Sequence, residues 1–354
     1  MFAKLSFLKY FLIILLLSLG LILIGQIIFD KTFNFPKKIT YGVTFSPEYA
    51  RFLKLDWQKT YIDILDQLKV RHLRLPSNWE EIELSEGQFD FSTTDFMLDE
   101  ASKRGAKVIL VVGNKQPRWP ECHTPLWAKA LTLEKRQEKI LNFIKIVVER
   151  YKDSSEVVAW QVENEPFLSF FGEDCDKPEI DFLKREVALV KSISNKPIIV
   201  TDSGELGSWI IPMQVSVIFG TTLYKQVYDP RFGYLEYPIL PYLYNIKSQI
   251  VQKIFARLPA GQAKNEQSSR ASRTNQKTII VELQTEPWIG TQDVAKDAEK
   301  QAQLFTLSKF QNYISFGQKT GFDTIYFWGV EWWYFMEKHG HPEYLEYAKT
   351  IFQQ

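Results

Sequence analysis

From Tyr41 onward the sequence alternates short apolar segments with longer segments whose apolar residues recur every three or four positions. The short runs predict strands and the longer amphipathic segments predict helices. Eight strands are expected, at residues 39–45, 72–76, 107–113, 157–164, 197–202, 215–220, 277–282 and 323–329. Helices are expected at residues 57–68, 93–104, 133–151, 179–193, within 242–256 and at 294–318, and the tail at 342–352 can close the ring. Strands that alternate with helices in this way predict an α/β protein with a parallel sheet, and eight such units predict a (β/α)8 TIM barrel.

The N-terminal segment, residues 1–29, differs from this pattern. Lys4 and Lys9 precede an apolar run from Tyr10 to Phe29, and about 20 apolar residues are enough to span a bilayer as a helix. The run is longer than the roughly 7–15 apolar residues of a secretory signal, and no small-residue cleavage site follows it. We therefore expect one uncleaved N-terminal transmembrane helix. A cleaved signal and a buried core helix remain open alternatives.

This interpretation divides the chain into two parts. Residues 1–38 form a membrane anchor (or signal) with a short linker, and residues 39–354 form one domain. Within the domain, residues 260–276 are polar and lack apolar periodicity, which predicts a flexible surface insertion.

Charge and cysteine content limit the classes of partner. The chain has 43 basic and 42 acidic residues, so no nucleic-acid partner is expected. Two cysteines, Cys122 and Cys175, are too few for a disulfide scaffold. They follow the third and fourth expected strands, so their loops are neighbours on one face of the barrel. A disulfide between them fits an oxidising compartment, and two free thiols are the alternative.

Two of the expected strands end on a carboxylate. Glu165 lies in the tripeptide Asn164-Glu165-Pro166, and Glu282 directly follows the apolar run of the seventh strand. Parallel α/β barrels place catalytic groups at the C-terminal ends of their strands, and paired carboxylates are the working groups of glycoside hydrolysis. Glu163 and Glu286 are the alternatives near the same two strand ends.

These two motifs resemble clan A glycoside hydrolases, the clan of the cellulase-like and β-galactosidase-like (β/α)8 families. The resemblance implies an acid/base on strand four, here Glu165, and a nucleophile on strand seven, here Glu282. Residues 86–96 resemble the second-strand loop of β-galactosidase-like members. Asn114 departs from the cellulase-like families, which often carry a histidine in this region.

Other residues are expected to support the two glutamates. Arg74 ends the second strand, where a guanidinium can hydrogen-bond the nucleophile and hold it ionised; the resemblance implies the same role. Asn164 can donate a hydrogen bond to a sugar 2-hydroxyl. The resemblance gives Tyr224, or alternatively Tyr228, the place of a tyrosine against the nucleophile. It gives Trp328 the place of a tryptophan under the sugar.

The remaining candidates for sugar contact lie in expected loops, where indole rings can stack on sugars. They are Trp79, Asn114, Lys115, Trp119, Trp288 and Trp332.

Together these features predict a retaining glycosidase that acts on a β-linked oligo- or polysaccharide, with its domain outside the cytoplasm. The alternative from another class is a catalytically inactive carbohydrate-binding protein on the same scaffold. No cofactor is expected. No metal is expected either, because His339 and His341 lack a carboxylate cluster at ligand spacing.

Overall fold

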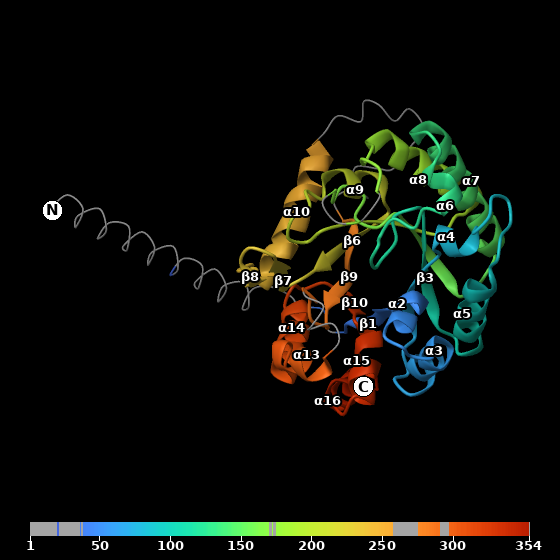
Figure 1. Cartoon of the computed structure of the whole chain (residues 1–354). Coiled ribbons are helices and arrows are strands. Elements are labelled where there is room, and N and C mark those ends of the chain that lie inside the picture. Colours follow the sequence, from blue (N-terminus) through green and yellow to red (C-terminus); the bar gives the residue numbers. More distant parts are fainter. Residues whose placement is uncertain are drawn as a thin grey trace.

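The computed structural model describes residues 38–169, 172, 175–257, 275–290 and 297–353, together with residues 20 and 36. Eight parallel strands close into one barrel in the order β1-β10-β9-β6-β5-β4-β3-β2 (Figure 1). This confirms the predicted eight-stranded barrel. The strands are β1 (Thr40–Thr44), β2 (His72–Pro76), β3 (Lys107–Val112), β4 (Val157–Val162), β5 (Ile198–Asp202), β6 (Ile218–Leu223), β9 (Lys277–Gln284) and β10 (Thr324–Trp328).

Helices surround the barrel and connect its strands (Figure 1). Several begin at side-chain caps, such as Asp56 before α3 and Thr132 before α7, whose oxygens accept hydrogen bonds from free backbone amides. The helices are α2 (Pro47–Phe52), α3 (Trp57–Asp66), α4 (Trp79–Ile82), α5 (Ser92–Lys103), α6 (Leu126–Lys129), α7 (Leu133–Tyr151), α8 (Ile180–Ile193), α9 (Ile210–Val215), α10 (Pro241–Arg257), α13 (Ala298–Leu304), α14 (Leu307–Gln318), α15 (Val330–Lys338) and α16 (Glu343–Phe352).

The apolar core has two parts, because successive side chains of a strand point to opposite faces. A small cluster that includes Ile109, Ile199, Ile279 and Val281 is separate from the larger cluster to which the helices and the other strand faces contribute. We assign the small cluster to the barrel interior, which side chains fill in such barrels.

A register shift in β9 changes which face its side chains occupy. Strand β9 has one more residue here than the neighbouring strand on either side. On the β6 side, Thr221 lies opposite Ile280 and Thr222 lies opposite Glu282, so Val281 has no partner. Without the shift, Glu282 would share the outward face of Ile280. With it, Leu283 packs in the larger cluster and Glu282 reaches Arg74 of β2 across the barrel. An irregularity of this kind re-aims a side chain at the end of a strand.

Some element boundaries differ from the predictions. β6 begins at Ile218 rather than at residue 215, because Val215 ends α9. The helix expected at 294–318 consists of α13 and α14, with Thr306 capping the second. The sequence analysis missed α9 and the antiparallel hairpin of β7 (Gln226–Asp229) and β8 (Gly233–Glu236).

Two predictions fall outside the described residues: the membrane-spanning run from Tyr10 to Phe29, apart from Gly20, and nearly all of the polar insertion at 260–276. Within the described parts of the chain, no helix combines the length and the hydropathy needed to cross a bilayer.

Candidate active site

Glu282 is buried at the mouth of the barrel between two donors. Arg74 donates from Nη1 to Glu282 Oε1 at 2.7 Å, and the Tyr224 hydroxyl donates to Oε2 at 2.9 Å. Burial raises the pKa of Tyr224 well above its ordinary value, and the charge of Glu282 raises it further. The hydroxyl therefore keeps its proton and remains a donor. A buried carboxylate needs such partners, because burial removes it from water.

Arg74 joins Glu282 to strand β4. Its side chain has no solvent exposure, and its Nε donates to Gln161 Oε1 at 2.7 Å. Its Nη2 donates to Asn164 Oδ1 at 2.6 Å. Because the Asn164 oxygen accepts from the arginine, the Asn164 amide nitrogen stays available as a donor toward a ligand.

Glu165 follows β4 in an uncommon backbone conformation. Its φ is 44° and that of Glu163 is 57°, a left-handed region that non-glycine residues rarely adopt and that recurs at functional sites. Thr201 Oγ1 accepts from the Glu165 amide, and Thr222 Oγ1 donates to Glu165 Oε1, both at 2.8 Å. Strand β4 ends at Val162, so Glu163 and Glu165 both lie in the loop that follows it.

The surroundings of Glu165 favour its protonated form. Burial raises the pKa of Glu165 well above the ordinary value, and the charges of Glu282 and Glu121 raise it further. A carboxyl group of this kind can serve as a general acid near neutral pH. Trp160 of β4 is not part of this environment, because its indole donates to Ser194 Oγ at 3.0 Å.

Glu163 has a structural role in the neighbouring loop. Its two carboxylate oxygens accept from the amides of Asn114 and Lys115 at 2.7 Å each. Gly113 leaves room for this contact, since a Cβ there would lie 2.2 Å from Glu163 Oε1. Lys115 also belongs to this support, because its Nζ donates to the carbonyls of Glu165 and Leu168.

A second buried arginine, Arg118, organises another part of the mouth. It forms ion pairs with Glu286 and with Glu331, the latter at 3.0 Å. Its guanidinium lies between two rings, 3.8 Å from the centroid of Tyr49 and 4.0 Å from that of Trp328. Glu286, the alternative to Glu282, is therefore occupied by Arg118. The sequence analysis missed Arg118, Glu331 and Tyr49.

The expected sugar-contact residues divide between the mouth and the core. Trp288 and Trp328 pack edge-on against Tyr224 with ring centroids 5.7 and 6.5 Å apart. Trp119 is 62% exposed on the β3 loop. Trp79 and Trp332, in contrast, are fully buried in the core, so their proposed role as sugar contacts is wrong.

The other candidates are engaged elsewhere. Asn114 Oδ1 accepts from Thr124 at 2.9 Å, which holds that side chain within its own loop. Tyr228 packs against Tyr234 in the β7–β8 hairpin, and only Tyr224 of the two tyrosines reaches Glu282 in the described structure.

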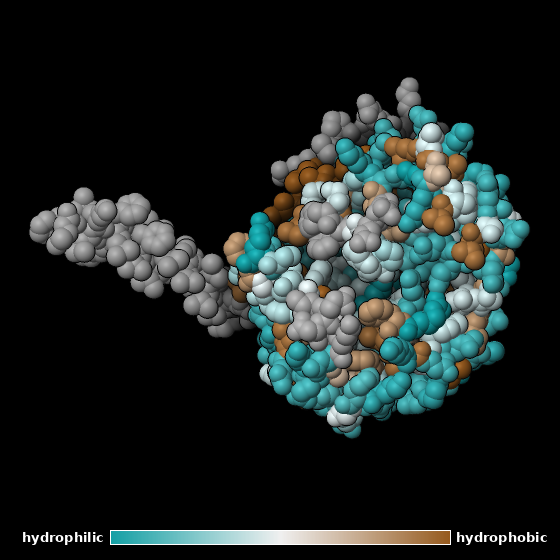
Figure 2. Space-filling view, viewed as in Figure 1, coloured by the Kyte–Doolittle hydropathy of each residue, from teal (hydrophilic) through white to brown (hydrophobic). Residues whose placement is uncertain are grey.

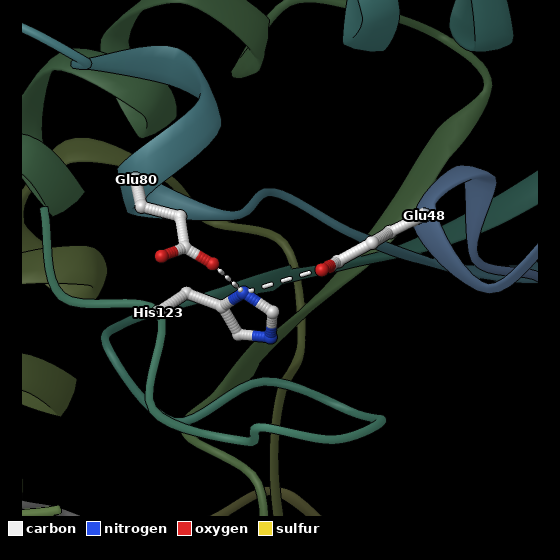
Figure 3. Close-up of side chains that lie close together, drawn as sticks. All are labelled: Glu48, Glu80 and His123. Carbon is white, nitrogen blue, oxygen red and sulfur yellow. Dashed lines mark hydrogen bonds and ion pairs between the residues drawn. The ribbon is translucent and has the colours of Figure 1, made fainter. Parts of the chain in front are cut away.

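The loops around the mouth are tied together. Cys122 and Cys175 form a disulfide between the loops that follow β3 and β4. His123 Nδ1 lies 2.7 Å from Glu80 and 3.8 Å from Glu48 (Figure 3). Although these three side chains lie as close together as metal ligands do, the short contact with Glu80 gives His123 Nδ1 a hydrogen-bond partner. We interpret the group as a clamp that joins the loop after β3 to helices α2 and α4.

Comparisons with known proteins agree with this architecture. The sequence matches the family model of glycosyl hydrolase family 10 over residues 76–172, a segment that contains Glu165 but ends before Glu282. No curated protein matches the sequence.

The fold resembles several solved structures, each matched over 82% of this chain. They are a β-galactosidase from Halorubrum lacusprofundi (13% identity, TM-score 0.51, 52% of that chain covered), xylanase 10B from Thermotoga petrophila in complex with xylobiose (15%, 0.50, 82%), and a β-galactosidase from Bacillus circulans sp. alkalophilus (11%, 0.50, 50%). The chain thus spans about half the length of these β-galactosidases. These similarities confirm the resemblance to clan A glycoside hydrolases and their (β/α)8 barrel.

Proposed function

We propose that this chain is a retaining glycoside hydrolase that cleaves a β-linked glycan, with Glu282 as the nucleophile and Glu165 as the acid/base. One observation carries the proposal. A single mouth holds a carboxylate fixed by Arg74 and Tyr224 together with a second carboxyl group whose pKa is raised. A carboxyl group whose surroundings favour the protonated form can act as the acid beside a second carboxylate that acts as the nucleophile.

In the first step, Glu282 attacks the anomeric carbon and the bond to the leaving oxygen breaks. Glu165 gives its proton to that oxygen, so the leaving group departs as a neutral alcohol and a glycosyl ester remains on Glu282. In the second step, Glu165 takes a proton from water as the water attacks the anomeric carbon and Glu282 leaves. Two inversions give a product with retained configuration.

Neighbouring side chains supply the sugar contacts in this proposal. The Asn164 amide nitrogen donates to the 2-hydroxyl, a hydrogen bond that strengthens in the transition state. Trp328 lies beneath the sugar at the point of cleavage. Trp288 and the exposed Trp119 are platforms for the remainder of the glycan. The family 10 match and the names of the structural neighbours, a xylanase and β-galactosidases, support a glycan substrate.

The stereochemistry of the first-formed product tests this mechanism. The purified full chain is screened against aryl β-glycosides of several sugars, and the anomer released from the best substrate is followed by NMR. Retention is expected, and an inverted product would refute the double displacement. Glycan binding without turnover on any substrate would favour the inactive carbohydrate-binding alternative.

We further propose that the N-terminal segment anchors the chain in a membrane, with the barrel outside the cytoplasm. The apolar run from Tyr10 to Phe29 supports the anchor. The Cys122–Cys175 disulfide supports an oxidising compartment. Protease added to intact cells is expected to cleave the domain, most readily within residues 260–276. Digestion that occurs only after lysis would contradict the outward orientation.

A further inference from the structure

Helix α10 exposes a stripe of aliphatic side chains. Leu243, Ile246, Ile250 and Ile254 are 40%, 37%, 53% and 44% exposed. Their spacing of three or four residues places them on one side of the helix. Figure 2 shows apolar residues gathered along the region where Figure 1 places α10.

Polar side chains of α10 face the barrel instead. Ser248 and Gln252 are buried, and Ser248 Oγ lies 2.8 Å from Thr278 Oγ1 of β9. Gln252 Nε2 donates to the carbonyl of Gln276 at 2.9 Å. Because these inward contacts fix the rotation of the helix, the isoleucines cannot turn toward the core.

Two further aliphatic side chains are exposed on other elements. They are Val217, just before β6, and Ile210 of α9, which contacts α10, at 55% and 39%. The outer surface of α7 is quite different, since it presents the charged side chains Lys135, Glu138, Lys145 and Glu149. Contiguous aliphatic side chains on an otherwise polar surface indicate an interaction site.

The rest of the sequence indicates what covers this face. Residues 30–39 connect the apolar run to β1, and a segment of that length reaches at most ~36 Å. A domain of this size is roughly 50 Å across, so a chain anchored through the run holds some face of the barrel close to the bilayer. α10 contains no acidic residue, and besides Lys247, whose ammonium is bound to the carbonyls of Gly204 and Gly207, it carries Lys253 and Arg257, a composition suited to an anionic lipid surface.

We propose that the outer face of α10 lies in the interfacial region of a lipid bilayer. The inference rests on the proposed membrane anchor and is independent of the proposed glycosidase activity. The helices of a (β/α)8 barrel run alongside its strands. An α10 that lies flat on the membrane therefore directs the barrel mouth sideways along the surface, toward glycans held near the membrane.

Site-specific fluorescence tests this contact in the full chain. The chain is reconstituted into phosphatidylglycerol–phosphatidylcholine vesicles with Ile250→Cys carrying an environment-sensitive fluorophore. The matched control is Glu149→Cys on α7, which Figure 1 places on the far side of the barrel from α10. The native cysteines are joined in a disulfide and do not react with the label. We expect a blue shift and quenching by lipids with brominated acyl chains at residue 250, and neither at residue 149.

Two further variants and a flotation assay separate the possible outcomes. Adding Ile246→Lys and Ile254→Lys to the labelled Ile250→Cys chain should abolish the quenching while the chain still floats with vesicles. A chain that floats but whose label at 250 is quenched by aqueous iodide would overturn the lipid contact and leave the anchor intact. Spontaneous disulfide dimers of the unlabelled Ile250→Cys chain, together with no lipid quenching of the labelled one, would assign the face to a second copy of the chain. A chain that does not float would overturn both the anchor and the contact, and turnover of aryl glycosides reports separately on the proposed activity.

Discussion

Two buried arginines hold carboxylates at the same barrel mouth in opposite ways. Arg74 comes from a strand and spreads its donors over one carboxylate, Glu282, and three neutral oxygens, those of Gln161, Asn164 and Thr44. Arg118 comes from a loop with a φ of 90° and pairs with two carboxylates, Glu286 and Glu331, while both faces of its guanidinium lie against aromatic rings.

We infer from this difference that Glu282 is placed to react, whereas Glu286 and Glu331 have a structural role. Among the described residues Glu282 shares its arginine with no other acid, and its second oxygen accepts from a tyrosine hydroxyl. Glu286 and Glu331 compete for one guanidinium and together fix the ring of Trp328 through it. We therefore assign the chemistry to the Arg74 cluster, which is Arg74 with Glu282, Asn164 and Gln161. The Arg118 cluster, which is Arg118 with Glu286, Glu331 and Tyr49, positions Trp328 as a platform for the sugar.

The largest effect is expected from Glu282→Gln, compared with Glu286→Gln. Both substitutions keep the size of the side chain and remove one carboxylate paired with a buried arginine. Loss of the nucleophile should lower kcat by at least ~10⁴-fold, as removal of a covalent catalyst does elsewhere. Glu286→Gln should retain kcat within about tenfold and lose stability, because a buried ion pair is broken. Steady-state kinetics on one aryl glycoside compares them.

Chemical rescue distinguishes loss of the nucleophile from misfolding. Azide should restore turnover to Glu282→Ala by attacking the anomeric carbon from the vacated side, giving a glycosyl azide of inverted configuration. Full activity in Glu282→Ala, or equal losses in the two glutamine variants, would break the assigned division between the clusters.

Glu165→Gln should have the next largest effect, and the loss should depend on the leaving group. General acid catalysis contributes typically about 10²–10⁴-fold, so alkyl glycosides should lose that much and activated aryl glycosides far less. The raised pKa of Glu165 predicts that wild-type activity falls on the alkaline side as this group loses its proton. That limb should disappear from the pH profile of kcat/KM in Glu165→Gln. An unchanged limb would assign the acid to another group.

The arginines themselves provide a smaller and more direct comparison. Arg74→Lys keeps the charge but cannot reach Glu282, Asn164 and Gln161 together, so kcat should fall by about 10–100-fold, the value of one or two charge-assisted hydrogen bonds. Arg118→Lys loses the stacking between Tyr49 and Trp328, a contact worth about 0.5–2 kcal/mol, which should appear mainly as a raised KM. A fall in kcat of equal size in both variants would place Arg118 in the chemistry.

The barrel could be predicted from the sequence because each strand and helix has a local signature. Alternating apolar periods and turn residues identify such elements one at a time, and the carboxyl ends of parallel strands meet on one face. That rule was enough to expect Arg74 and Glu282 at one mouth, where the structure places them. Tyr224 was expected there only from the resemblance, with Tyr228 as an alternative. The β9 register shift that aims Glu282 has no local signature of this kind.

The Arg118 cluster could not be predicted for a related reason. Arg118 meets Glu286 and Glu331 across separations of 168 and 213 residues, and no periodicity records such contacts. The tryptophans illustrate the same limit. Trp79 and Trp332 were expected in loops as Trp119 was, yet they lie in helices α4 and α15 and pack in the core. Composition does not reveal which way such a side chain points.

The smallest effect concerns a carboxyl group behind the Arg74 cluster that has no arginine partner in the described structure. Glu205 accepts hydrogen bonds from the Tyr224 amide at 2.9 Å and from the Tyr244 hydroxyl at 2.8 Å. Burial raises the pKa of Glu205 from 4.5 to about 7. Below about pH 4.5 the folded and unfolded states both hold the proton, and the group adds no pH dependence.

Between about pH 4.5 and 7 the unfolded chain loses this proton first, so the contribution of Glu205 to the free energy of unfolding falls as the pH rises. Glu205→Gln still accepts both hydrogen bonds and has no charge to bury. The Tm of Glu205→Gln should match that of the wild type near pH 4.5 and exceed it at pH 7.5, with kcat nearly unchanged. Each kcal/mol gained in the free energy of unfolding should raise the Tm by about 2–4 °C. Scanning calorimetry of both proteins across this range measures the difference. If the Tm values of the two proteins changed in parallel with pH, Glu205 would already be ionised in the folded protein. A charged carboxylate would then accept from the Tyr224 amide, just as a charged guanidinium donates to Glu282.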